Sequence, residues 1–289
     1  MVLGDSELIL NPDGSIYHLN LLPQDIASTI ITVGDPDRVR CISAYFDSIE
    51  VEKGKREFLT HTGSYKGKRI SVVSTGIGTD NIDIVFNELD ALVNIDFTTR
   101  QIKSNKTQLN FIRIGTSGAI QADIAVDTFL LSEIAIGFEG LLHFYNTNEA
   151  TEKVLEAKLN EYLGWKSHNI TAYAISSDES LRNEFLSNRI RLGITVTNSG
   201  FYGPQGRKLR LMPQIPDFNE KLAAFTYKNQ KITNLEMETA GIYGLSKLLG
   251  HRAISLNAIL ANRATGDFSK NPDKTIDNLI QYALEKLTQ

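Results

Sequence analysis

The sequence has one cysteine in 289 residues, so no disulfide can form within the chain. It lacks an apolar run long enough to cross a bilayer, and residues 1 to 20 lack the basic start and apolar centre of a signal peptide. The histidines show no metal-ligand spacing, and no HExxH or CxxC motif is present. These absences predict a cytoplasmic protein without a membrane partner or a transition metal.

An excess of basic residues is also missing. The formal net charge is −4 and the sequence pI is near 5.8, which argues against a broad basic face and therefore against a nucleic acid partner. Any bound anion has to be met by a few placed arginines. The composition, with 42% hydrophobic and 22% charged residues, is that of a globular protein, and we expect its ligand to be small.

Apolar, β-branched runs alternate with segments of helical period, which predicts an α/β fold. The expected strands are 29–33, 70–74, 110–114, 127–135, 192–197 and 253–261, and the expected helices are 36–47, 80–95, 151–163, 238–249 and 273–287. No linker or repeat divides the chain, so we expect a single domain over 1–289. Two polar stretches, about 97–109 and 165–190, are interpreted as peripheral insertions. The first predicts an extended connection and the second some helical structure around Glu179 to Asn188.

Two glycine-containing segments follow expected strands. In VGDPDRV, residues 33–39, Gly34 permits close backbone approach and Arg38 lies in the first turn of a helix, which suits an anion. The alternative is an ordinary turn with a surface arginine. STGIGTDN, residues 74–81, begins like a dinucleotide fingerprint, but Asn81 replaces the third glycine and no suitably spaced acid follows. This segment therefore predicts no Rossmann site, and the chain has no Walker lysine.

A third segment, RIGTSGAI, places an arginine at the end of a buried-looking strand. Arg113 needs an anionic or well-hydrogen-bonded partner if it is buried. The residues expected to form a loop after it, Gly115, Thr116, Ser117 and Gly118, offer hydroxyls and backbone N–H groups. A phosphate would satisfy all of these groups, and a structural ion pair with an internal carboxylate is the alternative.

The segment NLEMETAGIYGL, residues 234–245, predicts a short strand that runs into a helix. Glu236 and Glu238 flank Met237, and two carboxylates there suit a glycosidase acid/base pair. One carboxylate could instead chelate a vicinal diol through two charge-assisted hydrogen bonds. Capping of the helix by an acidic first turn is the third interpretation.

Two further segments carry side chains suited to a base. In FYGPQGR, Gln205 offers an amide donor and acceptor and Arg207 a fork of fixed donors, a combination able to read the edge of a cyclic imide such as uracil. A surface turn is the alternative, because Gly, Pro and Gln are ordinary turn residues. LANRATGD ends another apolar strand, where Asn262 and Arg263 are expected either to close a pocket over the base or, for Arg263, to form a salt bridge.

Taken in order, these motifs resemble the nucleoside phosphorylase family with the hexameric type of fold, from about residue 16 to the C-terminus. The resemblance implies a three-layer α/β/α domain around a mixed, barrel-like sheet. Within the family, FYGPQGR and the NR pair are similar to the uridine phosphorylases, whereas purine enzymes carry an aspartate near the position of Asn262. The implied activity is phosphorolysis of uridine by inorganic phosphate, with no other cofactor.

The resemblance also implies roles for individual residues. Phosphate would be held by Gly34, Arg38, Arg113 and Thr116, and by Arg56 from a neighbouring subunit. The ribose would contact Thr116, Glu236, Met237 and Glu238, together with His18 across the same subunit boundary. The base would contact Ser117, Gly118, Phe201, Gln205, Arg207 and Arg263. Catalysis would rest on Arg207, Gln205 and Arg113.

Family members of this type are homo-oligomers, and the resemblance implies a hexamer built as a trimer of dimers, or a dimer if the insertions alter packing. It also points to a potassium ion between subunits, near Glu57, Ile77 and Asn81. Asn81 stands where a serine is typical, which argues against that ion. The competing functions are a purine nucleoside phosphorylase, a hydrolytic nucleosidase and a non-catalytic nucleoside binder.

Overall fold

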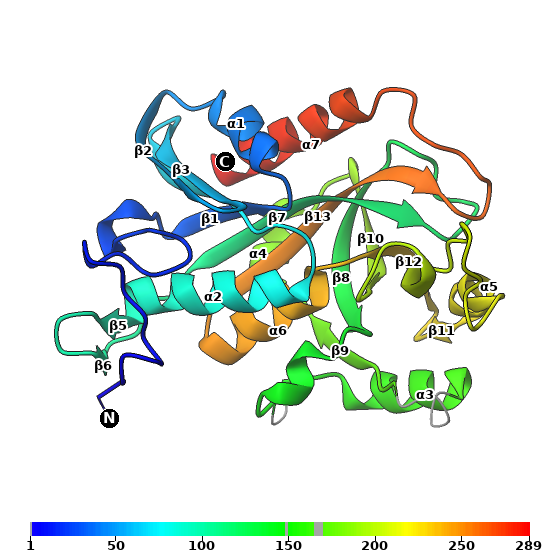
Figure 1. Ribbon diagram of the computed structural model, residues 1–289. Helices are drawn as coiled ribbons and strands as arrows, with labels where there is room; N and C mark the ends of the chain where they lie inside the picture. Colours follow the sequence, from blue (N-terminus) through cyan, green and yellow to red (C-terminus); the bar gives the residue numbers. More distant parts are fainter. Residues whose placement is uncertain (1, 148–149, 165–169) are drawn as a thin grey trace.

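A single large sheet runs through the centre of the computed structural model, which describes residues 2–147, 150–164 and 170–289 (Figure 1). Eleven strands belong to it: β1 (Thr29–Val33), β2 (Ser48–Lys55), β3 (Phe58–Tyr65), β4 (Lys68–Ser74), β7 (Asn110–Ala119), β8 (Phe129–Gly137), β9 (Tyr173–Ser176), β10 (Ile190–Thr197), β11 (Thr226–Tyr227), β12 (Gln230–Glu236) and β13 (Arg252–Asn262). The short strands β5 (Ile95–Asp96) and β6 (Gln101–Ile102) form a separate hairpin.

The sheet contains two sets of parallel strands that meet in antiparallel pairs. Strands β4, β1, β7 and β13 form one parallel set, and β8, β10 and β12 form the other. The sets join twice, where β13 pairs with β8 and where β12 pairs with β7. The second pairing closes a ring of β7, β13, β8, β10 and β12. This confirms the predicted mixed, barrel-like sheet.

Helices cover both faces of the sheet (Figure 1). On one face, α2 (Thr79–Asn94) and α6 (Thr239–Leu249) bury apolar side chains in a common core with β1 and β7. On the other, α1 (Pro36–Ser43), α4 (Glu179–Phe185) and α7 (Pro272–Leu287) build a second core. A third core joins the barrel to α3 (Lys153–Leu163) and α5 (Phe218–Ala224). The three-layer α/β/α prediction is confirmed.

All six expected strands are present, but one is clearly longer than the sequence suggested. β7 continues to Ala119, so the prediction of a loop over residues 115–118 is wrong. The continuation is paired on both sides, because Thr116 lies opposite Ala258 of β13 and Gly118 lies opposite Leu235 of β12. Ladder hydrogen bonds to two neighbours outweigh the weak strand propensity of glycine.

The two polar stretches also differ from expectation. The first contains β6, so it is partly a hairpin strand and not only an extended connection. In the second, residues 165–169 lie outside the described residues, and the prediction of a peripheral position is wrong for β9 and α4. β9 pairs with β8 inside the main sheet, and the side chains of Ile175 and Phe185 are fully buried. The helix expected around Glu179 is α4.

Within the described ranges, no helix is both long and apolar enough to span a membrane. The same part of the chain has no group of three or more His, Cys, Asp or Glu side chains that could hold a metal ion.

Candidate active site

A cavity of about 740 Å³ lies where strand ends from the two parallel sets meet. The antiparallel pairing of β7 with β12 causes this, because it sets the last residues of one set beside the last residues of the other. The cavity is lined by Gly34, Asp35, Pro36, Arg38, Glu57, Gly76, Ile77, Asn81, Arg113, Gly115, Thr116, Ser117, Gly118, Phe201, Gln205, Arg207, Leu235, Glu236, Met237, Glu238, Leu260, Ala261 and Phe268. Most of the predicted site residues therefore surround one space.

One part of the cavity wall carries two arginines. Arg38 comes from the start of α1, which the Asp35 side chain caps by accepting from the backbone N–H of Asp37. Nη1 of Arg38 donates to the carbonyl of Ile114 at 3.4 Å. Burial and the nearby charge of Arg113 lower the pKa of Arg38. A half-buried cation whose charge is disfavoured by burial and by a neighbouring cation makes a place where an anion would be stabilised.

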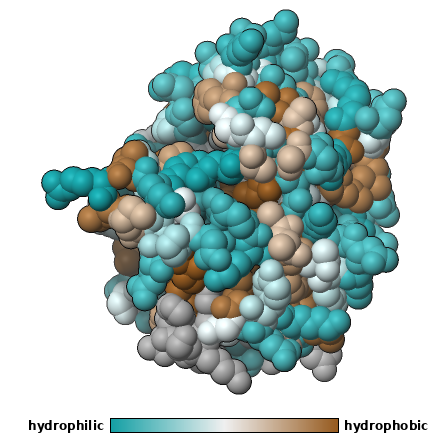
Figure 2. Space-filling model, turned by 90° about the vertical axis from the view of Figure 1, so that its right-hand side faces the viewer, coloured by the Kyte–Doolittle hydropathy of each residue, from teal (hydrophilic) through white to brown (hydrophobic). Residues whose placement is uncertain are grey.

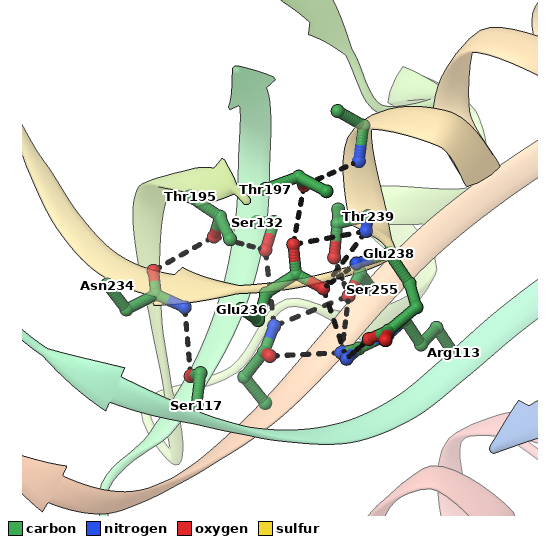
Figure 3. A network of polar contacts seen from close by, with 12 residues as sticks. Arg113, Ser117, Ser132, Thr195, Thr197, Asn234, Glu236, Glu238, Thr239 and Ser255 are labelled. Atoms are coloured by element: carbon green, nitrogen blue, oxygen red, sulfur yellow. Dashed lines mark hydrogen bonds and ion pairs between the residues drawn. The ribbon is translucent and has the colours of Figure 1, made fainter. Parts of the chain in front are cut away.

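Arg113 is buried and tightly held (Figure 3). Its Nη2 lies 2.7 Å from Oε2 of Glu238 and 3.1 Å from Oε2 of Glu236, and its Nη1 donates to Oδ1 of Asn257 at 3.1 Å. Burial opposes its charge, but the two carboxylates outweigh burial and raise the pKa of the guanidinium. The internal ion pair that was the alternative interpretation is thus present in this state of the site.

Gly115 makes room for that guanidinium. A Cβ atom at this position would lie 2.0 Å from Nη1 of Arg113. The arginine folds back over its own strand through the space that glycine leaves. Glycine at this position is therefore required by the arginine, and not by a turn.

The two glutamates have different surroundings. Glu236 accepts from the hydroxyl of Thr197 and from the backbone N–H groups of Glu238 and Thr239, so it caps the start of α6. It also binds Arg113, which leaves it unsuited to act as a free acid or base. This geometry argues against the glycosidase interpretation.

Glu238 accepts fewer hydrogen bonds than Glu236. Its Oε1 accepts from the backbone N–H of Gly78 at 2.8 Å, and its Oε2 accepts from Arg113. Burial raises the pKa of Glu238; Arg113 opposes this shift and the nearby Glu236 carboxylate adds to it. A carboxylate with two anchored oxygens on a cavity wall still has lone pairs for hydroxyl donors.

Another part of the wall carries the amide and guanidinium of FYGPQGR. Gln205 is buried at the end of a 3₁₀ turn (Gly203–Gln205), and Arg207 donates from Nη1 to its Oε1 at 2.7 Å. The Arg207 guanidinium also stacks on the ring of Phe201, 3.6 Å from the ring centroid. Burial and the charge of Arg263 lower the pKa of Arg207 to about 10, so it remains a cation at neutral pH.

The entrance is apolar. Ile77, Phe201 and Phe268 line the cavity, and each is at least half exposed to solvent. Figure 2 looks onto the side of the molecule that carries α5 and shows hydrophobic side chains in separate patches among hydrophilic ones. Exposed apolar groups at a cavity mouth suit either a planar ligand or a covering surface.

Three predicted site residues are not among the described residues that line the cavity. His18 pairs through Nδ1 with Oε1 of Glu88 at 2.6 Å, and Arg56 is exposed in the turn between β2 and β3. Arg263 is half-buried, and its Nη1 donates to the carbonyl of Gln205 at 3.3 Å. Asn262 is buried and holds the backbone carbonyls of Gln121 and Ile124.

Several lining residues were not predicted from the sequence. Leu260 and Ala261 lie near the end of an expected strand, so they could have been found by following that strand up to the NR pair. Phe268 has no comparable signal, because it reaches the cavity from a loop whose backbone bridges to Ala261.

Known proteins resemble this chain over most of its length. Residues 28–288 match the family described as the Phosphorylase superfamily. A uridine phosphorylase of Thermococcus kodakarensis is 34% identical over 277 residues, which cover 96% of this chain and 88% of that protein. A DeoD-type purine nucleoside phosphorylase of Shewanella denitrificans is 29% identical, with 93% of this chain and 96% of that protein covered.

The fold leads to the same group of proteins. A crystal structure of a Trypanosoma brucei nucleoside phosphorylase, described as showing uridine phosphorylase activity, has a TM-score of 0.88 and 28% sequence identity. The alignment covers 98% of this chain and 99% of that one. Because the family match spans nearly the whole chain and agrees with the ordered motifs, this chain belongs to the phosphorylase superfamily, which confirms the predicted nucleoside phosphorylase resemblance.

Proposed function

We propose that this protein is a uridine phosphorylase, a pentosyltransferase that reversibly converts uridine and phosphate to uracil and α-D-ribose 1-phosphate. One observation carries the proposal. A single cavity is lined by two arginines suited to phosphate, Arg38 and Arg113, and by an amide and guanidinium suited to uracil, Gln205 and Arg207. The Thermococcus kodakarensis and Trypanosoma brucei proteins support the same activity.

In this proposal, phosphate lies between Arg38 and Arg113, against the backbone of Gly34 and the hydroxyl of Thr116. The phosphate would share Arg113 with Glu238, so binding need not break the ion pair. Charge-assisted hydrogen bonds from two guanidinium groups give both affinity and a fixed direction of attack.

The ribose lies beside Met237 and Glu238. The carboxylate of Glu238 accepts from the ribose hydroxyls, while Thr116 lies between sugar and phosphate. Glu236 would act on the ribose only indirectly, because its oxygens are already bound to the start of α6. The resemblance implies that both glutamates contact the sugar, and this proposal keeps a direct contact for Glu238 only.

The base lies against Phe201, with Ser117 and Gly118 at its border. As the bond from C1′ to N1 breaks, its electron pair moves onto uracil, and the ribose gains cationic character. Arg207 and Gln205 stabilise the charge that develops on the uracil oxygens, and the phosphate oxygen forms the new bond at C1′. Uracil then takes a proton from water. No covalent enzyme intermediate is required.

His18 and Arg56 act in the cavity of a neighbouring subunit in this proposal, which therefore includes a homo-oligomer, either a dimer or a hexamer. An exposed Arg56 and a His18 with a quarter of its side chain exposed are available for that contact. Mixing subunits that carry His18→Ala with subunits that carry Arg207→Ala, each of which is expected to have a lowered rate on its own, tests this. Shared sites restore activity in one of the two cavities of a mixed dimer, whereas self-contained sites restore none.

We propose that the family's potassium ion is not bound near Glu57, Ile77 and Asn81. The amide of Asn81 packs against Gly76, where an added Cβ would lie 2.3 Å from Nδ2. The atom that faces Gly76 is the amide nitrogen, which is a hydrogen-bond donor and cannot coordinate a cation. Equal activity in sodium and potassium buffers is expected, and a several-fold preference for potassium would contradict this.

A purine preference is disfavoured by Asn262. Its amide is fully used in structural hydrogen bonds, to Gln121 and Ile124 on one side and from Ala264 and Thr265 on the other. Position 262 therefore offers no carboxylic acid to protonate a purine ring. Together with the single cysteine, this supports an enzyme of cytoplasmic pyrimidine salvage.

The deciding experiment measures uracil release from uridine with and without phosphate. Phosphorolysis predicts release only when phosphate is present. Equal release in both buffers would indicate a hydrolytic nucleosidase, tight uridine binding without release would indicate a non-catalytic binder, and faster turnover of inosine would indicate a purine enzyme.

A further inference from the structure

The interior of the barrel is polar where a closed sheet usually packs apolar side chains (Figure 3). Five fully buried side chains inside it, Ser132, Thr195, Asn234, Ser255 and Asn257, carry hydroxyl or amide groups. Burying such groups costs free energy unless each one finds partners. Their hydrogen bonds connect the arginine side of the cavity to Ser117, which lies on the cavity wall.

The direction of these hydrogen bonds follows from Arg113, the group at one end of the chain that can only donate. A guanidinium only donates, so the oxygen of Asn257 must face Arg113, at 3.1 Å. The amide nitrogen of Asn257 then faces Ser132 and donates to its Oγ at 3.2 Å. Because Ser132 accepts there, its own proton is free to bond Thr195, and the two hydroxyl oxygens lie 2.5 Å apart.

The same direction continues to the cavity. Thr195 donates to Oδ1 of Asn234 at 2.9 Å. The hydroxyl of Thr233 lies 2.8 Å from the same oxygen and 2.8 Å from the carbonyl of Ile194, and its one proton serves one of them. With its oxygen towards Thr195, the amide nitrogen of Asn234 faces Ser117 and donates to Oγ of Ser117 at 2.9 Å. Ser117 is therefore an acceptor inside the wall.

A serine hydroxyl that accepts on one side has one proton left to donate. Within the described residues, Ser117 Oγ has a hydrogen bond with Asn234 alone, and Ser117 lines the cavity. We propose that Asn234 is a positioning residue, which, fixed by this one-way chain from Arg113, makes Ser117 a hydrogen-bond donor to an oxygen of the bound nucleoside. The inference rests on the proposed function for the identity of the ligand.

The chain also links the two halves of the site. Reversing it at Asn234 would place an amide nitrogen against Thr195 and would turn the Ser117 proton away from the ligand. The direction is set at the arginine expected to bind phosphate, so the donor at Ser117 is oriented before the nucleoside enters. Orientation before binding lowers the cost of forming that contact.

A double-mutant cycle tests the proposal. Ser117→Ala removes the donor, and Thr195→Val, an isosteric change, removes the hydroxyl that fixes Asn234. We expect Ser117→Ala to lower kcat/KM for uridine by about tenfold, the size of one hydrogen bond left unmade. Thr195→Val should lower it several-fold, and the double variant should match Ser117→Ala within about twofold.

A matched control is Thr60→Val. Thr60 is equally buried in a strand, and its hydroxyl has no partner in the described chain, so the same change should leave kcat/KM within about twofold. Asn234→Asp is a second route, because a carboxylate can only accept and would capture the Ser117 proton. Asn234→Asp should therefore lower kcat/KM as much as Ser117→Ala does. Ser117→Thr, which keeps the hydroxyl, should retain most of the wild-type kcat/KM.

The same cycle is measured on the uridine dissociation constant by calorimetry without phosphate. This separates two failures. If the wild-type protein neither binds nor cleaves uridine, the proposed function and this inference fail together. If it does either, and the Thr195→Val and Ser117→Ala losses simply multiply, the orienting chain is wrong while the function stands.

Discussion

The proposed mechanism depends most on Arg207, and removal of this side chain gives a prediction of definite size. In Arg207→Ala, the cation that faces the charge developing on uracil is lost, together with its stacking on Phe201 and its bond to Gln205. Loss of one donor to a developing anion costs about 3 kcal/mol in enclosed sites. Arg207 is half-buried, so solvent screening reduces this to about 2 to 3 kcal/mol, or about 30- to 150-fold in rate.

The assay is phosphorolysis of uridine at saturating phosphate, followed by the absorbance change as uracil forms. The loss should fall on kcat as well as on kcat/KM, because the interaction strengthens as charge develops. Lys208→Ala is the matched control, since it removes an adjacent, exposed cation and should change the rate by less than about twofold. A rate for Arg207→Ala within about threefold of wild type would refute the assigned role.

Two further predictions concern stability. Gly115→Ala places a Cβ 2.0 Å from the Arg113 guanidinium and should lower the free energy of unfolding by about 2 kcal/mol or more in urea titrations. Gly118→Ala, where the nearest atom to an added Cβ is 3.8 Å away, should lower the free energy of unfolding much less. Equal losses in the two variants would contradict the packing argument. Burial lowers the pKa of His61 below 6.5, and Glu52 only partly opposes this shift. His61 therefore binds a proton more readily in the unfolded chain than in the folded one. Stability should therefore fall as pH drops through about 6.5, and His61→Gln should flatten that slope; an unchanged slope would exclude His61 as its cause.

The sequence predicted the fold well where hydrophobic period and turn residues agree. The central strands and helices appear at their expected places because each one carries a run of apolar residues next to glycine or proline. The hairpin of β2 and β3 was missed because β2 is largely exposed, with only three of its residues even partly buried. Such a strand has a charged, alternating sequence that resembles a surface loop.

The loop expected after Arg113 shows a different limit. Glycine at residues 115 and 118 predicts a turn from the local sequence, yet both residues are in β7. The decisive contacts come from β12 and β13, more than a hundred residues away. No local pattern encodes a pairing that closes a barrel.

The candidate site was predictable in its parts but not in its interior. Arg38, Gln205 and Arg207 could be chosen because their segments, taken in order with the others, resemble one family pattern. Asn234 and Asn257 could not, because a buried amide resembles any other polar residue until its partners are known. The sequence also could not show that Arg113 would hold two carboxylates at once.

The most direct test of the central claim is the identity of the second product. Uridine and phosphate are incubated with the protein, and the phosphorus is followed by NMR while uracil is measured in the same sample. Phosphorolysis predicts ribose 1-phosphate in a one-to-one ratio with uracil, and net synthesis of uridine when both products are supplied. Uracil release with phosphate unchanged would contradict it.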